Sequence, residues 1–197
     1  MVLEVGLAKM DLKIDAQTAL LMDTLYVASP NCDDRPDPDD ISLIVLHGIS
    51  LPAGQFGGDT VEHFFTNRLD PSSDPSFDEI KDMRVSAHLF IRRDGEIIQF
   101  VPFEKRAWHA GHSQYEGREQ CNDFSIGIEL EGTDDVEYTD SQYERLGRAI
   151  EAILLAYPDI SRDRITGHSN IAPGRKTDPG AAFDWAKLAH VLDGRLG

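Results

Sequence analysis

Hydrophobic residues along the 197-residue chain form short runs that predict strands and helices in alternation. The run 41–46 is apolar and rich in β-branched residues, which is typical of a strand buried on both faces. Two further runs, 87–91 and 96–101, flank Asp94-Gly95, and this dipeptide favours a tight turn between paired strands. The pattern therefore predicts a buried strand followed by a hairpin.

Residues 124–130 alternate between apolar and small or polar positions, as a strand with two different faces does. One face carries Phe124, Ile126, Ile128 and Leu130, and the other carries Ser125, Gly127 and Glu129. Carboxylates are disfavoured in strand centres, and the small neighbours Ser125 and Gly127 leave space above the sheet. We expect Glu129 either to face a cleft or to be a half-exposed edge residue.

Helical periodicity is clearest over 139–157, where Thr139 and Gln142 have the spacing of a capping box and Pro158 ends the helix. Its buried stripe is predicted to be Tyr143, Leu146, Ile150, Ile153 and Tyr157. A shorter helix is expected after Asp59 as N-cap, with Val61, Phe64, Phe65 and Leu69 facing inward. A last helix is expected over 181–192.

Segments rich in Gly, Pro and Asp separate these elements and predict loops over 30–40, 70–83, 102–122 and 161–180. Long loops in compact domains are more often functional than idle. Strands mixed with helices, including a hairpin, predict an α/β (α+β) fold with a central mixed β-sheet flanked by helices. We expect one domain, 31–197, with residues 1–30 as an N-terminal arm packed on it.

The composition excludes some partners. With 35 Asp and Glu against 19 Lys and Arg, the formal charge of −16 disfavours binding to nucleic acid or anionic membranes. No stretch of about 20 apolar residues exists, so a transmembrane span is not expected. Two cysteines, Cys32 and Cys121, are too few for a disulfide framework and suggest reduced thiols. A cytoplasmic location is the expected default.

The candidate chemistry centres on a few of the seven histidines. His47 ends the buried strand, His168 follows what we expect to be a helix, and Asp178 lies nearby. Imidazole and carboxylate side chains are ligands of Zn²⁺, and catalytic zinc sites use three of them with a water molecule. Spacing alone leaves His109 and His112 as competitors. Lys176, two residues before Asp178, would bring a cation to the same place.

The motifs that carry a family resemblance lie in order between about residues 30 and 185. They are VLHGISLP (45–52), RVSAH (84–88), IRRDGEI (91–97), KRAWHAG (105–111), CNDFSIGIELEGT (121–133), and GH (167–168) with IAPGRKTDPG (171–180). In these segments the chain closely resembles the AmpD family of 1,6-anhydro-N-acetylmuramyl-L-alanine amidases, whose zinc-amidase fold is shared with peptidoglycan-recognition proteins.

The resemblance implies His47, His168 and Asp178 as zinc ligands, Glu129 as the proton acceptor and Lys176 as the stabiliser of the transition-state oxyanion. The substrate contacts that we expect are Arg84, His88, Arg106, Trp108 and Ala172. Gly48 and Gln120 depart from the asparagine and arginine that better-known members carry.

The implied function is zinc-dependent hydrolysis of the amide between the lactyl group of N-acetylmuramic acid and L-alanine. The implied partner is an anhydro-muropeptide released in peptidoglycan recycling, and we expect a cytoplasmic monomer. Two alternatives remain open: a non-catalytic muropeptide-binding module on the same fold, and an amidase that acts on intact murein. The presence of all five implied zinc-site residues favours the enzyme.

Overall fold

A six-stranded mixed sheet forms the centre of the computed structural model, which describes residues 11–196. In spatial order its strands are β12 (Ile165–Gly167), β5 (Leu43–Ile49), β11 (Ser125–Glu131), β6 (Leu89–Ile91), β7 (Ile97–Gln99) and β3 (Leu25–Tyr26). The strands from β12 to β6 pair in parallel, whereas β6 and β7 form the predicted antiparallel hairpin. The predicted α/β fold with a mixed sheet is confirmed.

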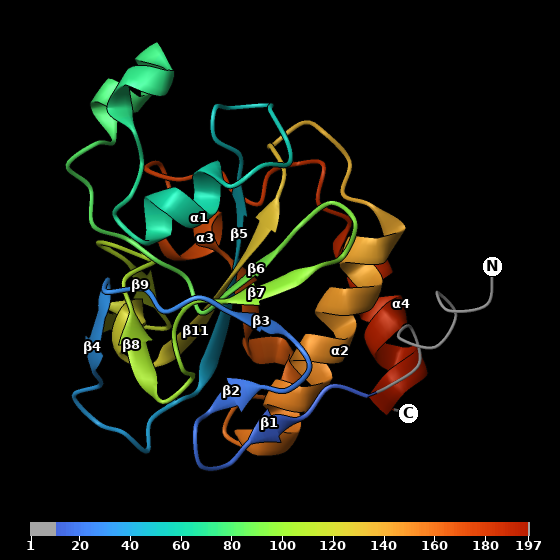
Figure 1. Cartoon of the computed structure of the whole chain (residues 1–197). Coiled ribbons are helices and arrows are strands. Elements are labelled where there is room, and N and C mark those ends of the chain that lie inside the picture. Colours follow the sequence, from blue (N-terminus) through green and yellow to red (C-terminus); the bar gives the residue numbers. More distant parts are fainter. Residues whose placement is uncertain (1–10, 197) are drawn as a thin grey trace.

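Helices cover both faces of this sheet (Figure 1). On one face, α2 (Asp140–Ala156) packs on the sheet and against α4 (Trp185–Leu196). On the other face lie α1 (Thr60–Phe65) and α3 (His168–Ile171). The remaining elements are short: β1 (Ile14–Asp15), β2 (Leu20–Leu21), β4 (Cys32–Asp34), β8 (Lys105–Ala107), β9 (Gln114–Tyr115), β10 (Arg118–Glu119), and the 3₁₀ turns η2 (Pro71–Ser73), η3 (Pro75–Glu79), η4 (Cys121–Asp123) and η5 (Arg162–Arg164).

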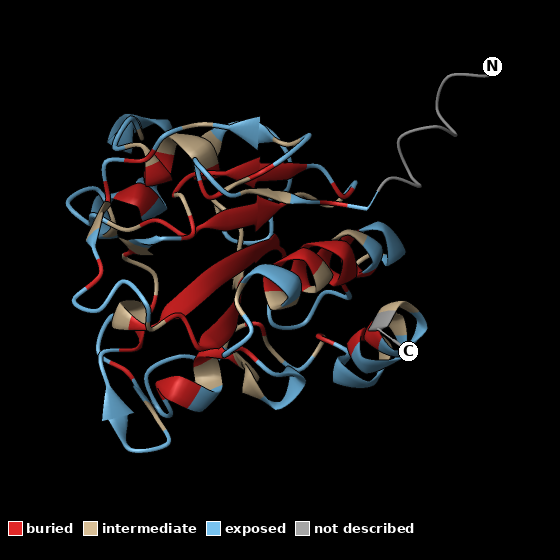
Figure 2. Cartoon of the chain, turned by 90° about the horizontal axis from the view of Figure 1, so that it is seen from below, coloured by how far each residue is buried: buried red, intermediate tan, exposed pale blue. Residues whose placement is uncertain are grey.

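The main core lies between the sheet and α2, and Figure 2 shows the central strands and the inner face of α2 as buried. Ile126, Ile128 and Leu130 of β11 pack in this core with Leu146 and Ile150 of α2. Full burial of an aliphatic side chain stabilises the fold by roughly 1.5–3 kcal/mol. The alternation in β11 therefore attaches one face of the strand to α2 and leaves the other face to the functional site.

The long helix begins as the sequence predicts. The Thr139 hydroxyl accepts a hydrogen bond from the Gln142 backbone N–H, and the Gln142 side chain accepts one from the Thr139 N–H, which completes the capping box. Asp59 is the N-cap residue of α1, as predicted, but its side chain makes no capping hydrogen bond.

Two other predictions need correction. Phe124 does not share the face of Ile126; it follows η4 in a non-extended conformation and packs in a separate small cluster with Leu43 and Val45. The predicted loop 161–180 contains strand β12 and helix α3, so His168 follows a strand rather than a helix.

Residues 11–30 of the predicted N-terminal arm are built into the body. Leu12, Ala19 and Leu21 are buried in the main core, and β3 adds an edge strand next to β7. The division at residue 30 stays a prediction, and residues 1–10 of the arm lie outside the described part.

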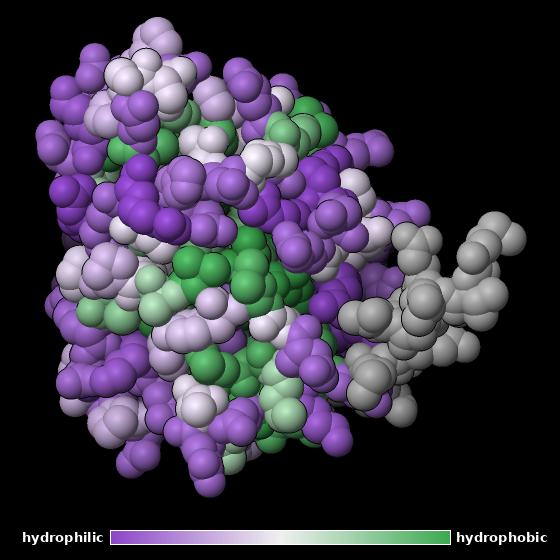
Figure 3. Space-filling view, in the orientation of Figure 1, coloured by the Kyte–Doolittle hydropathy of each residue, from purple (hydrophilic) through white to green (hydrophobic). Residues whose placement is uncertain are grey.

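The face seen in Figure 1 keeps some hydrophobic surface. Met22, Leu25 and Tyr26, in and beside β3, are exposed, and Figure 3 shows hydrophobic surface in the middle of the face on which β3 lies. Over residues 11–196, none of the helices combines the length and the apolar character that a membrane span requires.

Candidate metal and catalytic site

Strand register brings the two predicted histidine ligands together. β12 pairs in parallel with β5 so that Gly167 lies opposite Leu46, and the next residues along the two strands are His168 and His47. His168 begins α3, whose Ser169 backbone N–H donates to the carbonyl oxygen of Asp178 at 2.9 Å. This bond holds the Asp178 loop beside the start of the helix.

The three side chains converge on one point. His47 Nδ1 lies 3.0 Å from His168 Nδ1, and Asp178 Oδ2 lies 3.2 Å and 3.0 Å from those two nitrogens. Both imidazoles are buried and the carboxylate is partly buried. Two imidazole nitrogens and one carboxylate oxygen make a donor set that suits a transition metal.

Hydrogen bonding around His168 shows which nitrogen faces this point with a lone pair. Its Nε2 lies 3.0 Å from the carbonyl oxygen of Ala110. A carbonyl oxygen can only accept, so Nε2 carries a proton, and in a neutral imidazole Nδ1 then carries the lone pair. Such an outer hydrogen bond is typical of metal-binding histidines. The lone pair and the Asp178 carboxylate would repel each other without a cation between them, so the residues fit a bound metal.

Burial also keeps the imidazoles of His47 and His109 neutral. Desolvation lowers the pKa of His47 to about 4, although the hydrogen bond to Asp178 acts in the opposite direction. Desolvation and the neighbouring His47 likewise lower the pKa of His109 well below its ordinary value. Neutral imidazole is the form that binds metals.

Glu129 lies directly beside this cluster. In the parallel register of β11 and β5 it is the partner of His47, so both side chains point to the same face of the sheet. Its Oε2 is buried and, within the described chain, has no hydrogen-bond partner. Burial and the Asp178 carboxylate raise the pKa of Glu129 well above its ordinary value, and Lys176 acts against that rise. Of the two positions expected from the sequence, a cleft-facing residue or a half-exposed edge residue, the structure shows the first for Glu129.

A cavity of about 210 Å³ unites these groups. Its polar part contains His47, His109, Glu129, His168, Lys176, Asp178 and Arg175. Its apolar part contains Ile49, Phe64, Phe65, Met83 and Val85. Lys176 is exposed in the loop after α3, where its backbone N–H donates to the carbonyl of Ala172 at 3.0 Å. The cavity thus combines polar and charged side chains with apolar ones, and the converging histidines are among the residues that line it.

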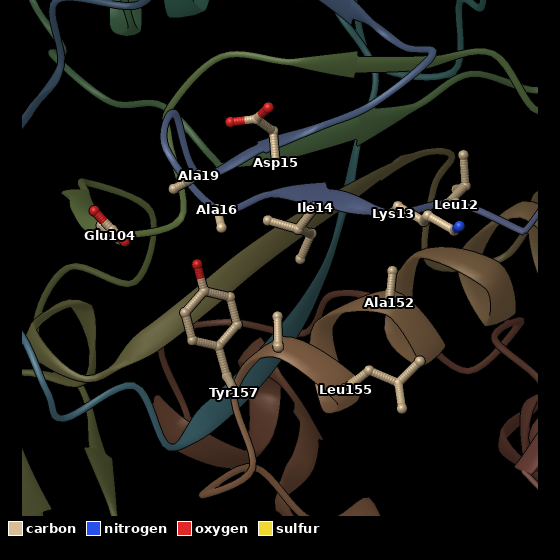
Figure 4. Close-up of a pocket in the computed structure, with 11 residues that line it drawn as sticks. Leu12, Lys13, Ile14, Asp15, Ala16, Ala19, Glu104, Ala152, Leu155 and Tyr157 are labelled. Carbon is tan, nitrogen blue, oxygen red and sulfur yellow. The ribbon is translucent and has the colours of Figure 1, made fainter.

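A larger groove of about 480 Å³ lies elsewhere, between the β1 segment and the C-terminal part of α2 (Figure 4). Leu12, Ile14 and Leu155 contribute apolar surface, and Tyr157 and Glu104 contribute polar groups. The described residues that line this groove include no histidine or cysteine. We therefore assign the chemistry to the smaller cavity.

The predicted substrate contacts are placed less favourably, because none of the five is among the described residues that line the cavity. Arg84 is exposed between two lining residues, and its guanidinium donates to the carbonyls of Lys81 and Met83. Trp108 is half-buried and donates from its indole nitrogen to Asp33 Oδ1 at 3.0 Å. Ala172 is buried at the end of α3.

Two of the expected contacts are occupied by other bonds. His88 is fully buried; its Nδ1 accepts from the Gly127 N–H at 3.0 Å, and its Nε2 lies 3.0 Å from the carbonyl of Lys105. Arg106 forms ion pairs with Asp33 at 2.6 Å and Asp123 at 2.7 Å, which raise its pKa. The structure does not support substrate contacts for His88 or Arg106.

Sequence reasoning underrated two residues of the cavity wall. His109 was a competitor for the ligand role, but the structure places its Nδ1 2.9 Å from His47 Nε2, behind the ligand. Arg175 was passed over beside Lys176; its guanidinium donates to the carbonyls of Ala110 and His112. The sequence signal was their position inside the motifs KRAWHAG (105–111) and IAPGRKTDPG (171–180). His112 itself is exposed.

Comparison with known proteins identifies the class of enzyme that this fold and site define. A family model described as N-acetylmuramoyl-L-alanine amidase matches residues 37–181, and the chain belongs to this family. More specifically, it is 60% identical over 162 residues to the 1,6-anhydro-N-acetylmuramyl-L-alanine amidase AmpD of Escherichia coli strain K12, covering 82% of this chain and 88% of that protein. The resemblance to AmpD is confirmed.

Solved structures agree. A crystal structure of a selenomethionine derivative of AmpD is 54% identical and covers 91% of this chain and 98% of that one, with a TM-score of 0.88. AmpDh3 of Pseudomonas aeruginosa, solved in complex with an anhydromuramic pentapeptide, is 31% identical with a TM-score of 0.58 and covers 79% of this chain and 61% of that one.

Proposed function

We propose that the chain hydrolyses the amide between the lactyl group of 1,6-anhydro-N-acetylmuramic acid and L-alanine, with zinc as its metal, in peptidoglycan recycling. The observation that carries the proposal is the convergence of His47, His168 and Asp178 beside the buried carboxylate of Glu129. The 60% identity to AmpD of E. coli supports the anhydro-muropeptide as substrate.

Zinc suits this donor set. Mg²⁺ and Ca²⁺ prefer oxygen ligands, whereas two imidazole nitrogens with a carboxylate favour Zn²⁺. Three protein ligands also leave a position open, which is the pattern of catalytic zinc sites. When bound, zinc supplies a Lewis acid that polarises a carbonyl group and acidifies water. His47, His168 and Asp178 would hold it.

Glu129 acts as the general base and then as the general acid. Its Oε2 accepts a proton from the water that attacks the lactyl carbonyl carbon. The same proton then passes to the alanine nitrogen as the carbon–nitrogen bond breaks, which gives a free amine on the peptide and a carboxylic acid on the sugar. The acid releases the second proton of the water to solvent and becomes a carboxylate. A carboxyl group whose pKa is raised by burial holds the proton between the two transfers better than an ordinary one.

Lys176 stabilises the negative charge that develops on the carbonyl oxygen. It lines the same cavity as Glu129, close enough to oppose the rise of that residue's pKa. A positioned cation acts most strongly where charge appears only in the transition state.

Substrate binding relies on local groups, since the formal charge of −16 does not attract the anionic stem peptide. Arg84, exposed beside the cavity, is proposed to bind a peptide carboxylate. Trp108 is proposed to offer an apolar face to the sugar, and Ala172 is proposed to line the groove. A monomer in the cytoplasm, without nucleic-acid or membrane partners, completes the proposal.

Product masses test the function directly. The zinc-loaded protein is incubated separately with anhydro-muropeptide and with intact murein, and the products are weighed by mass spectrometry. We expect anhydro-N-acetylmuramic acid and free stem peptide from the first substrate. Binding without cleavage would instead show a muropeptide-binding module, and release of peptide chiefly from intact murein would show a wall hydrolase.

A further inference from the structure

The space that Ser125 and Gly127 leave above β11 is filled by the ring of His109. This histidine comes from the loop after β8, and its ring lies so close to Gly127 that a methyl group on that residue would overlap it. The ring stands edge-on to His47, with ring centroids 5.0 Å apart. The small residues of β11 thus admit an imidazole between the strand and the metal ligand His47.

A chain of hydrogen bonds passes through this ring, and its direction is determined at one end. The Ser125 hydroxyl lies 2.5 Å from the backbone carbonyl of Cys121, which can only accept, so the hydroxyl proton is committed to it. Ser125 Oγ also lies 3.1 Å from His109 Nε2, and it must accept there. His109 therefore carries its proton on Nε2 and a lone pair on Nδ1.

The same reasoning extends to the metal ligand. His109 Nδ1 lies 2.9 Å from His47 Nε2, so His47 must donate from Nε2. A neutral imidazole has a single N–H, and His47 Nδ1 is left with a lone pair. That nitrogen is the one that faces His168 Nδ1 and Asp178 Oδ2.

We propose that His109 is a positioning residue that, together with Ser125, holds His47 in the tautomer able to bind the metal. The inference rests on the proposed metal site and adds a residue to it. Because the carbonyl of Ala110 sets the tautomer of His168, neighbouring residues of one loop control both histidine ligands.

Several hydrogen bonds hold the loop that contains His109 and Ala110 in place. The Asn122 side-chain oxygen accepts from the backbone N–H groups of His109 at 3.1 Å and Ala110 at 2.8 Å. The guanidinium of Arg175 donates to the Ala110 carbonyl at 2.6 Å. The loop can therefore orient the two ligands before any metal arrives.

The first test is on the metal-free wild-type protein. Nitrogen-15 NMR of the imidazoles reports which ring nitrogen carries the proton, and it needs neither metal nor substrate. We expect the Nε2–H tautomer for both His47 and His109. The Nδ1–H tautomer for His47 would overturn the inference.

The second test measures zinc affinity by competition with a chelator. His109→Phe removes the acceptor, and we expect a loss of about 10–100-fold, the usual effect of removing an outer partner of a metal ligand. Ser125→Ala, a smaller change that spares the His109 ring, should cause a smaller loss. His109→Asn keeps an acceptor near the position of Nδ1 and should recover part of the affinity. His112→Phe, in the same loop but exposed, should bind zinc as the wild type does.

The outcomes separate the two proposals. Wild-type protein that binds no zinc would defeat the proposed metal, whatever the variants do. Wild-type protein that binds zinc, with folded His109→Phe and Ser125→Ala variants that bind it equally well, would defeat the role of His109 alone.

Discussion

The two faces of strand β11 share one backbone but do different work. Ile126, Ile128 and Leu130 point toward α2 and belong to the main core. The opposite face carries Ser125, Gly127 and Glu129, which serve, respectively, a hydrogen-bond chain, the close approach of His109, and the cavity. The alternation of side chains in this seven-residue strand thus places the residues that stabilise the core on one face and the residues of the site on the other.

The two faces differ in the kind of side chain that they bury. On the core face the buried groups are aliphatic, and their burial stabilises the fold. On the cavity face one carboxyl oxygen of Glu129 is buried without a hydrogen-bond partner among the described residues, which is costly. We interpret that cost as part of the chemistry, because burial gives Glu129 its raised pKa.

The largest effect is expected on the cavity face. Glu129→Gln keeps the size of the side chain but removes the base, so kcat should fall by about 10²–10⁴-fold. Zinc content should stay at the wild-type level, because the three ligands are untouched. Steady-state kinetics with metal analysis on the same sample checks both. Full activity in this variant would remove Glu129 from the mechanism.

A smaller loss is expected across the cavity. Lys176→Met keeps much of the aliphatic chain and removes the cation, so kcat should fall by about 10²–10³-fold with little change in KM. Lys187→Met, on the surface of α4, is the matched control and should retain wild-type kinetics. An increase in KM alone would make Lys176 a binding residue.

The core face should respond in the opposite way. Ile128→Ala should lower the free energy of unfolding by about 2–5 kcal/mol through lost burial and a cavity. The folded fraction should keep its kcat, because Ile128 points away from the site. Denaturant unfolding and kinetics on the same preparation measure the two quantities. A large fall in kcat with unchanged stability would contradict the division of the two faces.

The pH dependence of stability gives the subtlest comparison. In the chelator-treated protein, the raised pKa of Glu129 means that the unfolded chain releases this proton near the ordinary value of 4.5, whereas the folded chain holds it to higher pH. The contribution of Glu129 therefore lowers the free energy of unfolding as pH rises above 4.5. Glu129→Gln should remove this part of the slope, which denaturant titrations at a series of pH values would show. An identical slope in both proteins would contradict the burial effect.

Much of the fold could be predicted because its long elements carry strong local signals. The capping box of α2, the hairpin at Asp94-Gly95 and the alternation in β11 each depend on neighbouring residues. β12 was missed because a three-residue, partly exposed strand has no periodicity to detect. It forms through its pairing with β5, far away in the sequence.

The site was predicted by residue type and resemblance, but its geometry was not. Arg106 was expected to be free for substrate, and only the fold shows that Asp33, 73 positions earlier, engages its charge. His109 could be counted as a histidine, but its task depends on a loop conformation and on the small residues beneath it. Contacts between segments that are far apart in the chain could not be predicted from the single sequence.

Metal analysis of His168→Ala, together with its rate of muropeptide hydrolysis, tests the central claim most directly. His190→Ala, which changes an exposed histidine of α4, is the control. The account predicts that His168→Ala loses tightly bound zinc and that hydrolysis falls to background, while the control keeps both. A His168→Ala protein that still hydrolyses anhydro-muropeptide at the wild-type rate, or a wild-type protein that stays fully active after its zinc is removed by chelation, would contradict it.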